Sequence, residues 1–225
     1  MKIGILTTGH RPEALPDHKT YSGMFRDLLD GQGFDFDNYD VVDGQFPASV
    51  EDADGWLITG SKHGAYDDLP WIAPLETLIR AAYAADIPMV GICFGHQIMA
   101  QALGGRVEKF SGGWSVGRVD YEFDGETLPL YAWHQDQVTA RPQEARVIAR
   151  TDFCENAGLV YGRKMFSVQP HPEFDAGFLT GLMEARGGAI PPEMLAEARA
   201  TVDKPVANAT LGRMIGQFFR DRSLA

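Results

Sequence analysis

The sequence predicts an α/β fold with three layers, in which a mostly parallel central sheet is flanked by helices and carries a small antiparallel addition. In the first half of the chain, short apolar runs typical of buried strands alternate with stretches whose apolar residues recur at helical spacing. This alternation implies parallel strands joined by right-handed crossovers. Between residues 106 and 169 short strands follow one another closely, and they predict the antiparallel addition at one side of the sheet.

Length and composition indicate a single soluble domain. The 225 residues are enough for a two-faced core, so we expect one domain over 1–225, with its core in about 1–174 and C-terminal helices in 175–225. The formal charge of −11 argues against a nucleic-acid partner or an anionic membrane, because both need clustered Lys and Arg. No apolar stretch reaches the length of a membrane span, and the N-terminus leads directly into a strand, which predicts a cytoplasmic protein.

The first half of the chain contains the elements of the parallel sheet. Apolar runs predict strands, and apolar residues at helical spacing predict helices bounded by Gly or Pro. The expected strands are 2–6, 34–42, 56–59 and 87–92, and the expected helices are 21–29, 71–85 and the segment from Gly95 to Gly104. The loop 7–20 hangs over the carboxyl edge of such a sheet. We interpret its His10 as a solvated histidine, with contact to a ligand as the alternative.

The second half is predicted to extend the sheet and then cover it. The expected antiparallel strands are 106–110, 117–123, 128–133 and 145–149. The segments 158–162 and 165–169 predict a hairpin that leads back to the core. Three helices, at 178–185, 194–202 and 211–219, are expected to cover one face of the sheet.

Cys93 lies at the turn between a predicted buried strand and a predicted helix. Gly91 and Gly95 flank it, and glycines at these positions keep side chains from colliding where the chain reverses sharply. The helix that follows offers free N–H groups and the positive end of its dipole, which favour a thiolate and can bind an oxyanion. We therefore interpret Cys93 as a nucleophile, with an inert buried cysteine as the alternative.

A second glycine turn follows the predicted strand 56–59. If this strand is the neighbour of the strand before Cys93, the amides of Gly60 and Ser61 face the thiol across the sheet edge. One of them would then complete an oxyanion hole with the amide of Phe94, and each such donor contributes about 3 kcal/mol to the transition state.

His171 is the predicted base for Cys93. It follows the strand 165–169 in a Pro-His-Pro-Glu segment that the two prolines hold extended. In an extended segment residues two apart point the same way, so Glu173 can orient the imidazole of His171. Sequence separation between a nucleophile and its base is unconstrained. We therefore expect Cys93, His171 and Glu173 to form a triad.

The other candidate residues are assigned lesser roles. His96 is expected to point along its helix, whereas His134 and Asp136 follow another strand and are expected to line the pocket. No third ligand accompanies this pair at a spacing that suits a metal, so we predict no metal site. The second cysteine, Cys154, is interpreted as a core residue, and the two cysteines form no disulfide framework.

These residues resemble the class I glutamine amidotransferase family, which has a flavodoxin-like fold. The family carries Gly-x-Cys-x-Gly-x-Gln at the nucleophile and His-Pro-Glu near its end, and both motifs are complete here. The resemblance spans about 2–174 and is closest to the amidotransferase part of GMP synthase and to stand-alone relatives such as γ-glutamyl peptidases. It implies the roles given above for Cys93, His171 and Glu173. It further implies contacts of the substrate with Gln97, with amides near Ser115, Val116 and Gly117, and with His134 and Asp136.

The chain departs from the family in two places. It has Gly60-Ser61-Lys62 where the family often has Gly-Gly-Pro, and no synthase domain follows the His-Pro-Glu motif. The resemblance implies cofactor-free hydrolysis of the γ-amide of glutamine through a γ-glutamyl thioester, with the ammonia passed to a partner, such as a separate synthase subunit, or to another acceptor. Two alternatives remain open: a stand-alone γ-glutamyl peptide or amide hydrolase, and a non-catalytic binding or regulatory module.

Overall fold

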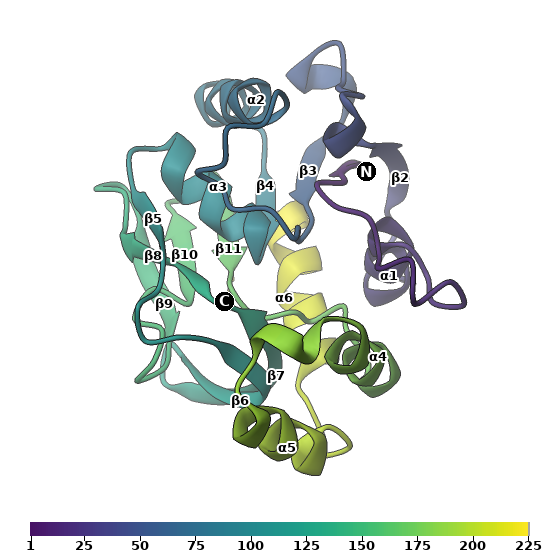
Figure 1. Cartoon of the computed structure of the whole chain (residues 1–225). Helices are drawn as coiled ribbons and strands as arrows, with labels where there is room; N and C mark the ends of the chain where they lie inside the picture. Colours follow the sequence, from purple (N-terminus) through teal and green to yellow (C-terminus); the bar gives the residue numbers. More distant parts are fainter. Residues whose placement is uncertain (225) are drawn as a thin grey trace.

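The computed structural model describes residues 1–224 and contains one large sheet and one small sheet (Figure 1). The large sheet has nine strands in the order β2-β1-β3-β4-β11-β10-β9-β6-β7, and β5 and β8 form the small one. The predicted fold class is confirmed. The strands are β1 (Lys2–Leu6), β2 (Asp35–Tyr39), β3 (Gly55–Ile58), β4 (Met89–Ile92), β5 (Arg106–Lys109), β6 (Ser115–Phe123), β7 (Glu126–His134), β8 (Asp136–Ala140), β9 (Arg146–Arg150), β10 (Gly158–Tyr161) and β11 (Met165–Val168).

The five strands from β2 to β11 pair in parallel. Their side chains alternate between the two faces of the sheet, so neighbouring residues of β3 enter different cores: Leu57 packs on one side, and Trp56 and Ile58 on the other. Because β3 and β4 are neighbours, the loops that follow them meet at one sheet edge. This is the juxtaposition expected from the sequence for Gly60 and Cys93.

The remaining strands of the large sheet pair antiparallel, as predicted. The hairpin of β10 and β11 returns the chain to the parallel strands, where β11 lies beside β4. The expectation for 134–138 was incomplete, because these residues were placed after a strand and not in one. After β7 the chain forms β8, which leaves the large sheet and pairs with β5.

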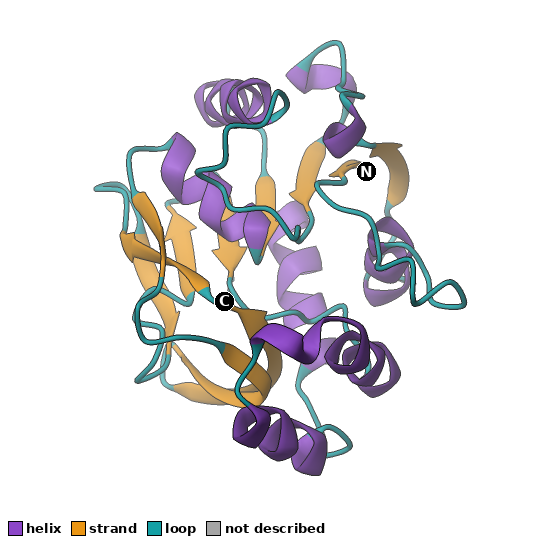
Figure 2. Ribbon diagram, viewed as in Figure 1, coloured by secondary structure: helices purple, strands orange, loops and turns teal. Residues whose placement is uncertain are grey.

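Helices cover both faces of the parallel strands (Figure 2). On one face α1 (Tyr21–Leu28) and α6 (Asn208–Asp221) share a core with the strands. On the other face α2 (Ile72–Ala84) and α3 (Phe94–Ala102) form a second core. Both cores consist mainly of aliphatic and aromatic side chains. The burial of their apolar surface away from water is the main favourable contribution to folding.

The expectation that all three C-terminal helices cover one face of the sheet is wrong for two of them. Only α6 packs on the parallel strands; α4 (Ala176–Arg186) and α5 (Pro192–Thr201) build a third core with residues of α1, β6 and β7. Gly117 of β6 allows this packing, because a Cβ there would lie 2.7 Å from the Cβ of Ala198 on α5. A short 3-10 helix, Gly187–Ala189, follows α4.

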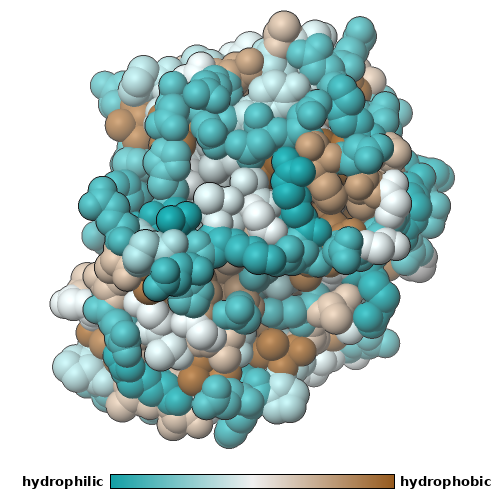
Figure 3. All heavy atoms as spheres, turned by 90° about the vertical axis from the view of Figure 1, so that its right-hand side faces the viewer, coloured by the Kyte–Doolittle hydropathy of each residue, from teal (hydrophilic) through white to brown (hydrophobic). Residues whose placement is uncertain are grey.

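The outer surface suits a protein in water. The edge strand β2 carries Asp35 and Asp37, and charges on an edge strand discourage pairing with other chains. The face that includes β2 and α1 is mostly hydrophilic, with apolar residues in small groups (Figure 3). No helix among residues 1–224 is both long enough and apolar enough to cross a membrane.

Candidate active site

Cys93 occupies a strained turn at the carboxyl end of β4. Its φ of 53° and ψ of −102° lie in a region that residues other than glycine rarely adopt. The flanking glycines are required by space, as predicted: a Cβ at Gly95 would lie 2.5 Å from the carbonyl oxygen of Ile58, and one at Gly91 would lie 2.5 Å from that of Gly95. Cys93 caps the N-terminus of α3, so Phe94 is the first residue of a helix whose leading N–H groups have no partner within the helix.

His171 lies beside Cys93, although 78 positions separate the two in the sequence. Its Nδ1 donates to Oε1 of Glu173 at 2.7 Å, and its ring and the Cys93 side chain both lie next to Gly60. Nδ1 is thus occupied by Glu173, which leaves Nε2 for the sulfur. Cys93, His171 and Glu173 are buried, with 4–8% of their surface exposed. The structure therefore brings together the three residues that the sequence predicts as a triad.

The Glu173 carboxylate and a Cys93 thiolate would together favour the protonated imidazole of His171. Burial alone would lower the pKa, because it disfavours the charged ring, but the negative charges of Glu173 and of a Cys93 thiolate, with hydrogen bonds to both, outweigh burial. Together they raise the pKa of His171 to about 10. A proton accepted from the thiol would therefore be held on the imidazole at neutral pH.

Backbone and ring contacts fix the orientation of His171. Its amide donates to the carbonyl of Tyr131 on β7 at 2.8 Å, in a single bridge between the segment after β11 and the antiparallel half of the sheet. Its ring lies flat against the ring of Phe174, with centroids 4.0 Å apart and an angle of 6° between the planes. The base is thus held on one side by a carboxylate and on its face by an aromatic ring.

Gly60, in the loop after β3, completes this group of residues. A Cβ at Gly60 would lie 3.2 Å from Cε1 of His171 and 3.8 Å from the Cβ of Cys93. The Gly60 carbonyl accepts hydrogen bonds from the hydroxyls of Thr8 and Thr59, both buried, which fixes the orientation of the Gly60–Ser61 peptide plane. In a trans peptide the N–H of the next residue points away from that carbonyl, so the Ser61 amide is turned away from Thr8.

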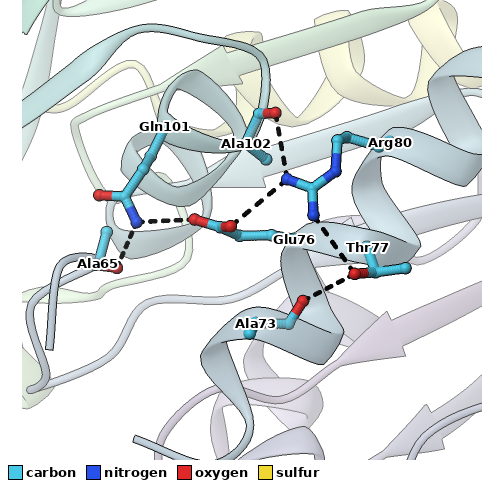
Figure 4. Close-up of polar contacts among 7 residues, drawn as sticks. All are labelled: Ala65, Ala73, Glu76, Thr77, Arg80, Gln101 and Ala102. Carbon is cyan, nitrogen blue, oxygen red and sulfur yellow. Dashed lines mark hydrogen bonds and ion pairs between the residues drawn. The ribbon is translucent and has the colours of Figure 1, made fainter. Parts of the chain in front are cut away.

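Side chains from α2 and α3 anchor the rest of this loop (Figure 4). Gln101 on α3 donates from Nε2 to the carbonyl of Ala65 at 2.7 Å and to the carboxylate of Glu76 on α2 at 2.8 Å. Arg80, one turn further along α2, pairs with Glu76 and reaches the carbonyl of Ala102. The loop is therefore tied to the helix that begins at Cys93.

A cavity of about 420 Å³ opens beside Cys93, between the N-terminus of α3 and the segment of α4 and the following 3-10 helix. Of the site residues predicted from the sequence, those that line it are Gly60, Ser61, Cys93, Gln97, His134, Asp136 and His171. Glu173 and Phe94 are buried and do not line it. Ser115, Val116 and Gly117 do not line it, but Trp114, the residue immediately before them, does.

Two of the lining side chains are fixed by the protein itself. Gln97 donates from Nε2 to the carbonyl of Asp136 at 2.9 Å and to Oε1 of Gln169 at 3.1 Å. His134 donates from Nδ1 to the same Asp136 carbonyl, and burial lowers its pKa to about 3, so it is neutral. Each can therefore offer a fixed uncharged surface to a ligand. In residues 1–224 no group of three His, Cys, Asp or Glu side chains is arranged to hold a metal ion.

Comparison with known proteins identifies the family. The family model "Glutamine amidotransferase class-I" matches residues 38–180. The chain belongs to this family. Gamma-glutamyl peptidase 4 of Arabidopsis thaliana is 30% identical to this amidotransferase over 91% of the chain and 90% of that protein. A glutamine-hydrolysing GMP synthase subunit of Archaeoglobus fulgidus is 38% identical over 39% of the chain and 53% of its own length.

Solved structures agree with this amidotransferase over nearly its whole length. A glutamine amidotransferase from Methylobacillus flagellatus superimposes with a TM-score of 0.76 at 26% identity, covering 97% of this chain and 92% of the other. A glutamine amidotransferase from Thermotoga maritima has the same fold, with a TM-score of 0.78 at 22% identity and coverages of 98% and 97%. Both structures extend past residue 180, so they include the C-terminal helices.

The cavity of this amidotransferase also contains residues that the sequence did not single out. They come from α1, from the strands β5 and β7, from loops, and from α4 with the 3-10 helix after it: Tyr21, Lys62, His63, Tyr66, Lys109, Trp133, Phe174, Leu182, Arg186 and Ala189 are among them. Lys62 directly follows the glycine turn predicted at Gly60 and Ser61, so its place at the cavity could have been predicted from the sequence. The position of Arg186 at the end of a helix far along the chain carries no such signal. His10 lies at the surface, where it pairs with Asp43, as interpreted from the sequence.

Proposed function

We propose that this amidotransferase hydrolyses γ-glutamyl amides through a γ-glutamyl thioester on Cys93. The observation that carries the proposal is the contact of His171 with both Cys93 and Glu173 at the edge of a cavity. A thiol with a histidine base that a carboxylate orients is the arrangement that nucleophilic acyl transfer requires.

In the proposed first half-reaction, His171 accepts the thiol proton and the sulfur of Cys93 attacks the γ-carbonyl carbon. The oxygen that gains negative charge is held by the amides of Phe94 and Ser61. The orientation of the Gly60 carbonyl toward Thr8 favours Ser61 over Gly60 as the second donor. The C–N bond then breaks, and His171 gives its proton to the departing amine.

In the second half-reaction, water attacks the thioester carbonyl while His171 accepts a proton from it. The C–S bond breaks, glutamate leaves, and the proton returns from His171 to the sulfur of Cys93. Glu173 keeps the ring in the tautomer and orientation that both steps need.

The substrate end of the cavity is assigned by its charges. Lys109 and Asp136 line the cavity together with Trp114 and Trp133, and this pair of opposite charges matches the carboxylate and ammonium of an α-amino acid. Gln97 and His134 lie beside Asp136. We place the glutamyl group there, with its γ-carbonyl at Cys93.

Two observations favour γ-glutamyl peptides and amides as substrates beside glutamine. The match to gamma-glutamyl peptidase 4 covers nearly all of both proteins. In addition, about 420 Å³ is within the range of pockets that hold drug-sized ligands, which are larger than glutamine. Glutamine hydrolysis with transfer of ammonia to a separate synthase is the second candidate, supported by the match to the GMP synthase subunit of Archaeoglobus fulgidus.

The test is a panel of γ-glutamyl compounds, including glutamine, incubated with the purified chain and scored for release of glutamate. We expect turnover by the chain alone, and loss of both turnover and covalent trapping by a γ-glutamyl electrophile in Cys93→Ala. Cys154→Ala is the matched control and should retain both. Activity in Cys93→Ala refutes the mechanism. A wild-type chain that neither turns over nor is trapped supports a binding module.

A further inference from the structure

The wall of the cavity beyond His171 leads to Arg186. Phe174 stacks on His171, and Tyr21 stacks on Phe174 with centroids 6.4 Å apart and an angle of 25°. The charge of Arg186, the last residue of α4, acts on the Tyr21 hydroxyl and partly opposes the rise in the pKa of Tyr21 that burial causes. His171, Tyr21, Phe174 and Arg186 all line the cavity, so one continuous wall runs from the base to a guanidinium.

This wall faces the part of a substrate that leaves. In the proposed reaction His171 delivers its proton to the nitrogen of the departing amine, so that nitrogen must lie against the imidazole. Whatever the nitrogen carries then extends past His171, away from the end where Lys109 and Asp136 lie. Arg186 is placed to contact this part of the leaving group.

The same region has an excess of positive charge. Lys62 and Arg186 line it, and the acid nearby, Asp67, is already engaged by the amide of Gly64 at 2.9 Å and by His63 at 4.0 Å. Burial lowers the pKa of His63, and the charges of Lys62 and Arg186 lower it further against the opposing effect of Asp67. Lys62 and Arg186 thus bring two positive charges to the cavity of a chain whose formal charge is −11.

Both cations are available to a ligand. None of the ion pairs formed within residues 1–224 includes Lys62 or Arg186, although twelve such pairs are found elsewhere. The guanidinium of Arg186 has five N–H donors. Planar guanidinium groups match carboxylates in a bidentate geometry.

We propose that Arg186, assisted by Lys62, binds a carboxylate on the leaving group, so that the enzyme prefers γ-glutamyl amino acids and peptides to glutamine and to uncharged γ-glutamyl amides. The inference rests on the proposed function and names the substrate class of the same site. Arg186 lies past residue 180, where the family match ends. This preference is therefore supplied by the end of α4, beyond the matched region.

The test compares two substrates that differ in one group. γ-Glutamylglycine carries a carboxylate on its leaving amine, and γ-glutamyl ethylamide does not. For the wild-type chain we expect kcat/KM to be about tenfold higher for γ-glutamylglycine than for γ-glutamyl ethylamide, as for a charge-assisted hydrogen bond at a partly exposed site. The quotient of these two kcat/KM values is the ratio used below. Turnover of the ethylamide and of glutamine reports on the proposed function independently of this ratio.

In Arg186→Gln the ratio should fall about tenfold, mainly through a higher KM for γ-glutamylglycine. Arg199→Gln is the matched control: it also removes a guanidinium from the C-terminal helices, but Arg199 pairs with Glu184 at the surface, and the ratio should not change. Arg186→Glu should reverse the preference, toward the γ-glutamyl conjugate of ethylenediamine, whose leaving group is cationic. An unchanged ratio in Arg186→Gln overturns the proposal.

Equilibrium binding keeps the proposal testable if the chain proves inactive. In a Cys93→Ala background, calorimetry should show γ-glutamylglycine binding more tightly than the ethylamide, and Arg186→Gln should remove this difference. Equal binding of the two ligands before the Arg186 substitution contradicts the carboxylate site. Binding with the expected difference but without turnover in the parent chain contradicts only the proposed hydrolysis.

Discussion

Phe174 covers one face of the His171 ring, with centroids 4.0 Å apart and the planes within 6° of parallel. Phe174 itself is buried and packs on Phe178 of α4 at 4.6 Å. The orientation of the base therefore depends on the core built by the C-terminal helices. Phe174, which lies outside the family motifs, thus controls the orientation of His171, which lies inside the His-Pro-Glu motif.

The first prediction concerns this contact. Phe174→Leu should lower kcat by about tenfold, because the imidazole loses the surface that holds its plane, and should lower the free energy of unfolding by about 2 kcal/mol. Phe178→Leu is the matched control: it removes a ring from the same core without touching His171, so stability should fall similarly while kcat falls much less than in Phe174→Leu. Steady-state kinetics and urea unfolding measure both quantities. Equal kcat in the two variants would contradict a positioning role.

The second prediction concerns the space at Gly60. In Gly60→Ala the new methyl group would lie 3.2 Å from Cε1 of His171, so either the ring or the loop must shift by a few tenths of an ångström. We expect kcat to fall by roughly ten- to a hundredfold, since proton transfer and the oxyanion donor both depend on these positions. Gly177→Ala on α4 serves as control, because its Cβ meets ordinary contacts. Full activity in Gly60→Ala would show that the loop adapts without cost.

The parallel half of the fold and the turn at Cys93 were predictable because their signals are local. Buried parallel strands are continuous apolar runs, and the glycines that flank Cys93 form a short local motif, although the close contact that requires Gly95 is with Ile58 of β3. The pairing of His171 with Glu173 was predictable for the same reason, since two prolines fix the extended backbone between the residues. That His171 meets Cys93 required one long-range assumption, that β11 lies beside β4, and this is the observed pairing.

The missed features depend on contacts between distant segments. Strand β8 was not predicted, because pairing with β5 stabilises 136–140 and the sequence around Asp136 carries no clear alternation. The packing of α4 was misjudged because its buried residues cover a broad face of the helix and not one narrow stripe. The placement of Tyr21 and Arg186 in one cavity wall follows from that packing, so local pattern could not reveal it.

The third prediction uses the charge of Glu173. Because the pKa of His171 is raised from 6.5 to about 10 in the folded state, its proton stabilises the fold fully below about pH 6.5, and this contribution is lost as pH rises toward 10. In Glu173→Gln the carboxylate is gone and burial favours the neutral ring, so the loss of stability between these pH values should be smaller. Urea unfolding at several pH values tests this, with the exposed Glu193→Gln as control. Equal pH dependence in Glu173→Gln and wild type would contradict the assignment.

The fourth prediction concerns the anchor of the loop after β3. Gln101→Ala removes the hydrogen bonds to Ala65 and Glu76, which should cost about 1 kcal/mol in the free energy of unfolding and raise KM, because Lys62 and Tyr66 sit on this loop. Thr77→Ala is the control: Thr77 lies on α2 near Glu76, and its hydroxyl bonds within its own helix. Its KM should match the wild type, whereas an unchanged KM in Gln101→Ala would show that the loop is held by other contacts.

The fifth prediction separates the two cysteines by reactivity. Burial raises the pKa of Cys154 to about 12, and only 1% of the residue is exposed, so it has almost no thiolate at neutral pH and little access to reagent. Cys93 lines the cavity and contacts His171, which can accept its proton. Iodoacetamide at neutral pH should therefore modify one thiol per chain, located at Cys93 by mass spectrometry, and at least tenfold faster than Cys154. His171→Ala should slow this labelling while Cys154→Ala leaves its rate unchanged, and labelling that proceeds as fast without the imidazole would mean that the helix terminus alone activates the sulfur.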